Sequence, residues 1–165
     1  MIKLSGIEKM TNEQKYKYML IVLEGQLGSE KNDLANISNA AAIIKAVMDK
    51  LNWVGFYILR GNSLVLGAFQ GLPACNRIEI GKGVCGTAVA QRKLQRIENV
   101  NEFPGHIACD SASKSEIVIP IIKEGVVYGV LDVDSPELGR FTELEEKYLT
   151  QFVLKLNKYI DWSKV

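Results

Sequence analysis

Three cysteines and a single histidine are the residues of this 165-residue chain whose types could do chemistry. His106 stands three residues before Cys109 in the stretch FPGHIACDSASKSEIVIP (103–120), and Cys75 and Cys85 come earlier in the chain. A neighbouring histidine and cysteine can be a nucleophile and its base, a pair of metal ligands, or parts of a loop without chemistry. These three alternatives require different surroundings.

The spacing of the cysteines argues against a metal site and against a Cys–His hydrolase. No C-x-x-C pair occurs, and with one histidine a zinc site would need a carboxylate or water among its ligands. Hydrolases usually bring cysteine and histidine together from distant parts of the chain. We therefore expect no bound metal, and we expect His106 to shape its loop or line a pocket. All three cysteines lie in polar loops containing Gly or Pro, which favours reactive over structural cysteines.

The segment GKGVCG (81–86) matches the pattern G-x-G-x-x-G. No β-α-β unit surrounds it, so the sequence does not favour a dinucleotide site. Glycines allow backbone N–H groups to approach a ligand closely, and a helix that begins beside them favours an anion. Cys85 lies at this helix start, where a thiolate is also favoured. The alternative is a tight turn that needs flexible backbone angles.

Three carboxylates are predicted to gather on one face of a sheet. Asp132 and Asp134 alternate along the strand-like segment VVYGVLDVDS, so both point to the same side. Glu116 joins them only if the preceding hairpin has the right turn. A two-residue loop of Glu124 and Gly125 would send it to the opposite face, whereas a three-residue loop that includes the preceding lysine pairs it with Asp132. We favour the longer loop. Clustered carboxylates need a cation or a shared proton, and the alternative is a solvated strand end.

An aromatic wall is predicted beside these acids. Trp53, Gly55 and Tyr57 share one face of a strand-like segment, WVGFYILR (53–60). Two aromatic rings with a glycine gap between them, next to carboxylates, suit a small cation that also has an apolar part. The alternative is ordinary cross-strand packing.

The elements that must position these residues are helices at both ends of the chain and two hairpins between them. Hydrophobic periodicity, capping boxes and turn residues predict helices over 15–27 and 33–51, hairpins 53–60/63–70 and 115–123/126–135, a short helix within 81–91, a short strand at 95–98, and a helix from Thr142. Strands joined by tight turns form an antiparallel sheet. We expect an α+β domain over residues 1–165, with helices on one face and a pocket under loops on the other.

Composition restricts the classes of partner and location. A net charge of +1 leaves no electrostatic footprint for nucleic acid or for an anionic membrane surface. The N-terminal segment has no apolar signal-peptide region, and the apolar runs are far shorter than a membrane span. We therefore expect a cytoplasmic protein, in which a permanent disulfide framework is uncommon.

Three long stretches resemble the free methionine-(R)-sulfoxide reductases, a stand-alone branch of the GAF domain family. They are GLPACNRIEIGKGVCGTAVAQ (71–91), FPGHIACDSASKSEIVIPI (103–121) and GVLDVDSPELGRFT (129–142), and the resemblance extends over about residues 53–141. It implies a GAF fold, with a twisted antiparallel sheet, helices on one face and the ligand under loops on the other. It also implies a homodimer that uses no cofactor and takes electrons from thioredoxin.

The resemblance further implies roles for individual residues. Cys109 matches the cysteine that attacks the sulfoxide, Cys85 matches the one that resolves, and the role of Cys75 is not settled. The residues that match the substrate pocket are Trp53, Tyr57, Glu116, Asp132 and Asp134. The implied reaction is reduction of free methionine-R-sulfoxide by thiolate attack, through a sulfenic acid and a disulfide. The alternative function is a GAF ligand sensor or redox switch without turnover.

Overall fold

The computed structural model describes residues 6–107 and 110–165. Within these residues the strands form one six-stranded sheet in the order β3-β2-β1-β6-β5-β4, and every neighbouring pair is antiparallel. The strands are β1 (Trp53–Arg60), β2 (Ser63–Gln70), β3 (Arg77–Glu79), β4 (Gln95–Ile97), β5 (Ser115–Lys123) and β6 (Val126–Ser135). Both predicted hairpins are confirmed, and pairing between β1 and β6 joins them into one sheet.

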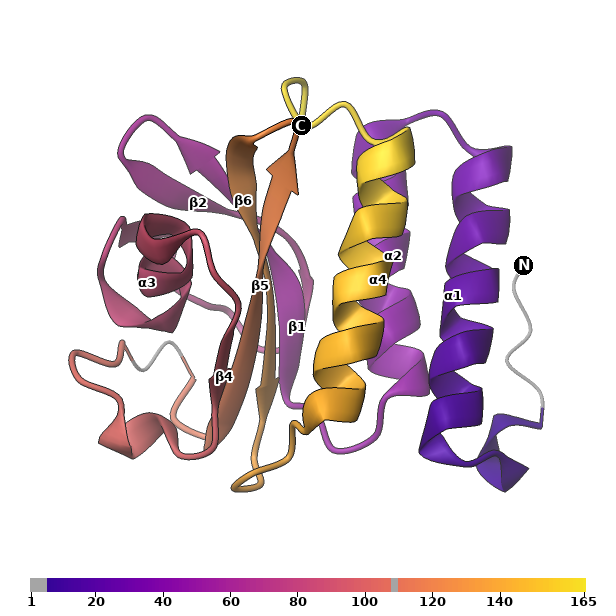
Figure 1. The fold of residues 1–165 in the computed structure, drawn as a ribbon, viewed down its shortest axis with the longest axis horizontal. Coiled ribbons are helices and arrows are strands. Elements are labelled where there is room, and N and C mark those ends of the chain that lie inside the picture. The colour runs from indigo at the N-terminus through magenta and orange to yellow at the C-terminus, as the bar shows by residue number, and fades with distance from the viewer. Residues whose placement is uncertain (1–5, 108–109) are drawn as a thin grey trace.

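Helices cover the two faces of the sheet unequally. The long helices α1 (Asn12–Ser29), α2 (Asp33–Val47) and α4 (Glu143–Tyr159) lie on one side, and α3 (Gly83–Gln91) lies on the other with the long loops (Figure 1). Two short 3-10 turns, Ile7–Lys9 and Val100–Glu102, complete the described elements. This is the α+β arrangement predicted from the element order. None of the helices in the described segments combines the length and apolar character needed to span a bilayer.

Both predicted capping boxes are present and fix where α1 and α4 begin. Thr11 and Thr142 each accept a hydrogen bond from a backbone N–H of the first turn, while Gln14 and Glu145 reach back to the cap N–H. The Glu145 carboxylate also accepts hydrogen bonds from the hydroxyl of Tyr16, at 2.7 Å, and from Arg140. One buried carboxylate therefore begins α4 and also links it to α1.

Two separate hydrophobic cores lie on the two faces of the sheet. The larger core packs the three long helices against β1, β5 and β6, and α4 contributes Tyr148, Leu149, Phe152, Val153 and Leu156 to it. The smaller core lies under α3 and includes Trp53, Tyr57, Val84, Cys85, Val118 and Val130. Leu34 at the start of α2 and Tyr159 at the end of α4 are exposed and do not belong to either core.

The hairpin between β5 and β6 corrects the predicted turn. Lys123 pairs directly with Val126, so the loop has two residues, Glu124 and Gly125, and both have positive φ values of 52° and 79°. This is the geometry of the tight hairpin turns that match the twist of the strands. The three-residue loop that we favoured is therefore wrong.

A β-bulge nevertheless places Glu116 on the expected face. The register shifts between Ile121, which pairs with Gly129, and Ile122, which pairs with Val127, so β6 contains one extra residue. Glu116 consequently pairs with Asp134 and not with Asp132. A Cβ atom on Gly129 would lie 2.1 Å from the carbonyl oxygen of Tyr57, so the close approach of β1 at this bulge requires a glycine.

Candidate active site

A pocket lies on the α3 side of the sheet, opposite the long helices. Its empty volume is about 370 Å³, including space open to solvent, and it is lined by Ile78, Gly83, Val84, Cys85, His106, Ile107, Asp110, Ser113, Glu116, Asp132 and Asp134. A smaller hollow of about 190 Å³ is lined by Trp53, Tyr57, Ala74, Asp110, Asp132 and Asp134. The two share three aspartates, so we treat them as two lobes of one site. All five predicted substrate-pocket residues line one lobe or the other.

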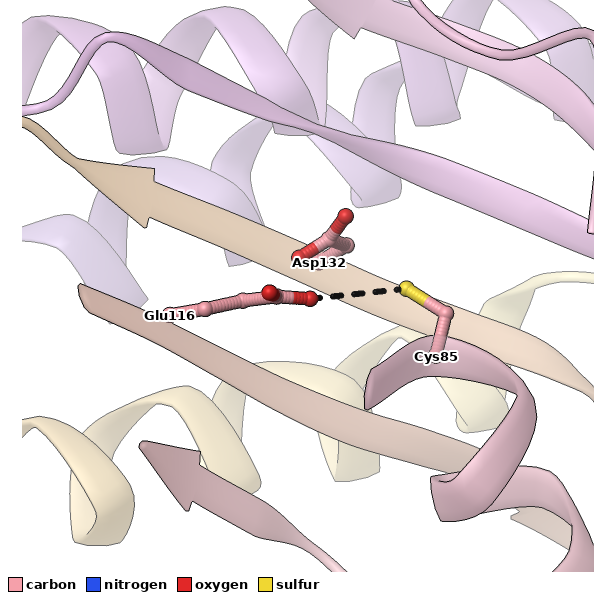
Figure 2. A group of neighbouring side chains, drawn as sticks. All are labelled: Cys85, Glu116 and Asp132. Carbon is pink, nitrogen blue, oxygen red and sulfur yellow. Dashed lines mark hydrogen bonds between the residues drawn. The ribbon is translucent and has the colours of Figure 1, made fainter. Parts of the chain in front are cut away.

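Two carboxylates and a thiol meet at the bottom of this site. Glu116 on β5 and Asp132 on β6 are each 6% exposed, and the Glu116 carboxylate points toward Cys85 on α3 with Asp132 beside it (Figure 2). One ligand atom from each of the three residues lies within 4.8 Å of the others. One oxygen of Asp132, Oδ1, is buried without a hydrogen-bond partner among the described residues. The acids therefore form a cluster under strong mutual repulsion, as predicted, and not a solvated strand end.

Burial makes the charged forms of these acids unfavourable. Desolvation raises the pKa of Asp132 to about 6, and the neighbouring Cys85 and Glu116 act in the opposite direction. The pKa values of Glu116 and Asp134 are also raised well above their usual range, first by burial and then by the charge of Asp132. At neutral pH the cluster is thus poised to accept a cation or to hold protons.

The protein supplies little positive charge to this cluster. No lysine or arginine is among the described residues that line either lobe. His106 is the one basic side chain there, with its Nε2 3.7 Å from Oε2 of Glu116, and burial lowers its pKa. The prediction that His106 lines a pocket is confirmed. A cation for the three acids must therefore come largely from the ligand.

The N-terminus of α3 offers the opposite polarity a short distance away. Gly83, Val84 and Cys85 form its first turn and line the main lobe, and no side chain caps it. Among the described residues, these three backbone N–H groups have no acceptor, because the first turn of a helix lacks intrahelical partners. Such N–H groups together with the helix dipole attract an anion. One end of the pocket, formed by the acids, therefore favours a cation, and the other end, at the first turn of α3, favours an anion.

The aromatic wall is present, and it also holds a loop over the smaller lobe. Trp53 stacks on Phe69 and Tyr57, with ring centroids 5.5 and 5.9 Å away. Trp53 Nε1 donates a hydrogen bond to the carbonyl of Leu72, and the hydroxyl of Tyr57 donates one to the carbonyl of Cys75. The glycine gap that we expected between the rings is filled, because a Cβ on residue 55 would lie within 2.6 Å of Phe69 and Trp53.

The two described cysteines are in different states. Cys75 is in a disulfide, whereas Cys85 is a free thiol that is 3% exposed. Burial raises the pKa of Cys85 well above its usual range, and the charges of Asp132 and Glu116 raise it further. Desolvation and the two carboxylates therefore oppose the thiolate that we expected at the helix start. Cys109, the predicted nucleophile, lies outside the described residues.

Sequence reasoning missed two polar residues that line the site, Asp110 and Ser113. Both follow Cys109 in a polar loop, and that position is the signal that could have identified them. Asn52 holds this loop, since its Nδ2 donates to Asp110 Oδ2 and to Ser113 Oγ, each at 2.9 Å. Asp110 thus adds a fourth carboxylate to the rim of the pocket.

The raised pKa values predict that unliganded protein loses stability as the pH rises. An acid whose pKa is raised by folding keeps a proton that the unfolded chain has released, so its contribution declines from about pH 4 through its folded pKa, about 6 for Asp132. One such group changes the free energy of unfolding by about 1.4 kcal/mol per pH unit within that window. We expect a falling melting temperature between pH 5 and pH 8, and a shallower fall in Asp132→Asn.

The lowered pKa of His106 acts in the opposite direction, because the folded protein resists its protonation at low pH. His106→Gln is therefore the matched control and should steepen the decline. A melting temperature that rises steadily from pH 5 to pH 8 in the unliganded protein would contradict the proton-holding cluster.

Comparison with known proteins agrees with the architecture. The GAF domain family model matches residues 39–155. The chain is 49% identical over 134 residues to the free methionine-R-sulfoxide reductase of Escherichia coli, covering 81% of each chain. It is 39% identical over 157 residues to the protein of the same name from Saccharomyces cerevisiae, covering 90% of this chain and 87% of that protein.

A solved structure shares the fold closely. The free methionine-R-sulfoxide reductase from Neisseria meningitidis, in complex with its substrate, superposes with a TM-score of 0.89 at 38% identity. The match covers 94% of this chain and 93% of that one. The similarity therefore extends over nearly the whole of both chains.

Proposed function

The chain belongs to the GAF domain family, and from that premise we propose that it is an oxidoreductase that reduces free methionine-R-sulfoxide to methionine. The observation that carries the proposal is the pairing of buried acids with an uncapped helix N-terminus in one pocket. An unmodified amino acid has an ammonium and a carboxylate on one carbon, and these two groups match the two ends of the site. Relatives named for this activity support the choice of substrate.

Each part of the substrate has a counterpart in the pocket. The ammonium is placed against Glu116, Asp132 and Asp134, where it supplies the missing positive charge. The carboxylate is placed at the first turn of α3, against its backbone N–H groups. The S-methyl end is placed toward the lobe walled by Trp53 and Tyr57, whose rings suit a small apolar group.

The chemistry is a transfer of oxygen from the substrate to a cysteine. The Cys109 thiolate attacks the sulfoxide sulfur, an acid of the pocket donates a proton to the oxygen, and methionine leaves as Cys109 becomes a sulfenic acid. A second thiol then displaces water from this sulfenic acid and forms a disulfide, and an external dithiol reduces the disulfide again. The disulfide at Cys75 supports Cys75 as that second thiol, in place of Cys85.

The remaining features of the proposal rest on the resemblance to the reductase branch. We assign thioredoxin as the physiological reductant, the cytoplasm as the location, a homodimer as the assembly, and residues 1–165 as one GAF-like domain without a cofactor. Cys75 lies in a partly exposed segment, which suits access by a protein dithiol. A ligand sensor with the same fold is the competing function, and it would bind methionine sulfoxide without consuming it.

Turnover of the free substrate is the decisive test. Purified protein is incubated with dithiothreitol and racemic methionine sulfoxide, and both epimers are measured by chiral chromatography. We expect the R-epimer to be consumed and the S-epimer to remain. N-acetyl-methionine-R-sulfoxide should be reduced far more slowly, because a neutral amide cannot supply the cation that the acids require. The matched control is the same reaction without protein. Equal rates for free and acetylated substrate would contradict the proposed recognition, and binding without product would favour the sensor.

A further inference from the structure

We propose that the same pocket also binds a thiophilic divalent cation such as Zn²⁺, with Cys85, Glu116 and Asp132 as its ligands. From the sequence we expected no metal, because the cysteines are widely spaced and only one histidine is present. The fold changes that expectation, since it brings one cysteine and two carboxylates together from three separate elements (Figure 2). Competition between this ion and the substrate rests on the proposed function, whereas binding of the ion does not.

The spacing of the three side chains suits a small tetrahedral ion. Cys85 Sγ lies 3.9 Å from Glu116 Oε1, and the chosen atoms of all three residues lie within 4.8 Å of one another. Zinc bonds of about 2.3 Å to sulfur and about 2.0 Å to oxygen put such ligands about 3.5 Å apart at a tetrahedral angle. Side-chain rotations that bring Cys85 Sγ and Glu116 Oε1 closer by about 0.4 Å, and Asp132 closer to them by at most about 1.3 Å, would complete the three bonds.

An unpartnered oxygen is the second observation that indicates a ligand. Asp132 Oδ1 is buried and has no hydrogen-bond partner among the described residues, although its residue lines the pocket. A buried carboxylate oxygen without a partner is costly, and a cation in the cluster would satisfy it. The fourth coordination position would face the open lobe, so that water could occupy it, as in zinc sites with three protein ligands.

The donor set favours a zinc-like ion over magnesium or calcium. Sulfur ligands select zinc and similar ions, whereas magnesium and calcium take oxygen ligands at six or more positions. The lobe offers no lysine or arginine among its described lining residues to compete for the acids. The ion would need the same carboxylates that the proposed function assigns to the substrate ammonium. Zinc and methionine sulfoxide should therefore exclude one another.

Metal titration with cysteine variants tests the site directly. In the double variant Cys75→Ser/Cys109→Ser, Cys85 is the one cysteine left in the sequence. Titration with Co²⁺, in a buffer free of chelators and dithiols, should give one ion per chain and a thiolate-to-cobalt charge-transfer band. Zn²⁺ should displace the cobalt and abolish the band. The matched variant Cys85→Ser keeps the other two cysteines, and its affinity for Zn²⁺ should fall at least tenfold, as it should in Glu116→Gln.

Several outcomes would overturn or support the site without reference to catalysis. Absence of the band from the double variant, or undiminished Zn²⁺ affinity in Cys85→Ser, would overturn it. If the double variant does not fold, as judged by its melting curve, the band is sought in wild-type protein with the Cys75 disulfide formed, where Cys85 is free. Its absence there would equally overturn the site.

Competition is measured separately, so that the two proposals can fail independently. Methionine added to the cobalt protein should weaken the band in proportion to its concentration, and Zn²⁺ should raise the KM for the sulfoxide without lowering kcat. Binding of Zn²⁺ by a protein that reduces no sulfoxide would leave the metal site standing and remove the reductase function. Reduction of the sulfoxide by a protein that binds no Zn²⁺ would support the reductase function and overturn the metal site.

Discussion

Replacement of Cys109 by serine is expected to abolish release of methionine, even in a single turnover. A hydroxyl at this position cannot attack the sulfoxide sulfur at neutral pH, because its pKa is far above that of a thiol and it forms no stable sulfenic counterpart. Cys85, the free thiol that lines the pocket, is a poor substitute, since burial and two carboxylates favour its protonated form. The measurement is methionine released per chain from fully reduced protein without added reductant.

The other two cysteines should separate in two measurements, turnover with a protein dithiol as reductant and the mass of each protein after the reductant-free assay. Cys75→Ser is expected to release about one methionine per chain and then stop, because the sulfenic acid has lost the partner that the disulfide at Cys75 indicates. Cys85→Ser should keep turning over with dithiol reductant. Mass spectra of the product proteins should show one added oxygen in Cys75→Ser and loss of two hydrogens in wild type and Cys85→Ser.

Two outcomes would contradict the assignment of Cys109 as nucleophile and Cys75 as resolving thiol. A full single turnover by Cys109→Ser would move the nucleophile to another cysteine. A stalled Cys85→Ser beside a freely cycling Cys75→Ser would restore the division of roles that the resemblance implied, with Cys85 as the resolving thiol. The control for folding is the melting temperature of each variant, measured in the reduced state.

Much of the architecture could be predicted because local signals determine it. Thr11 and Thr142 begin their helices through capping boxes that are visible in the sequence, and both boxes are present in the structure. Alternation along 126–135 correctly placed Asp132 and Asp134 on one face. These features depend on residues a few positions apart, which is why they required no knowledge of the tertiary fold.

The features that the sequence did not reveal depend on contacts between distant segments. The bulge beside Gly129 is set by the approach of β1, and it decides which residue Glu116 faces. The helix start at Cys85 favoured a thiolate, but packing buried it beside carboxylates from β5 and β6, and that reversed the expected direction of its pKa. Asp110 lines the site because its loop is hydrogen-bonded to Asn52, which is more than fifty residues away in sequence.

Replacement of Asp132 by asparagine should lower kcat/KM for free methionine-R-sulfoxide by about 100-fold. The substitution removes a buried acid that we propose binds the substrate ammonium. Loss of such a charge-assisted contact costs about 3 kcal/mol, where 1.4 kcal/mol is a factor of ten. Glu116→Gln should have a similar effect, because its carboxylate belongs to the same cluster. Both variants should fold, since an amide fills the same space and relieves repulsion within the cluster.

The acetylated substrate distinguishes recognition from a general defect. N-acetyl-methionine-R-sulfoxide lacks the ammonium, so Asp132→Asn should change its slow reduction by less than about threefold, well under the 1.4 kcal/mol of a tenfold effect. Glu137→Gln is the matched control, because Glu137 is a half-exposed acid that pairs with Lys50 outside the pocket, and it should leave both rates unchanged. If Asp132→Asn kept full kcat/KM while losing more than about 2 kcal/mol of stability, the cluster would serve the fold and not the substrate.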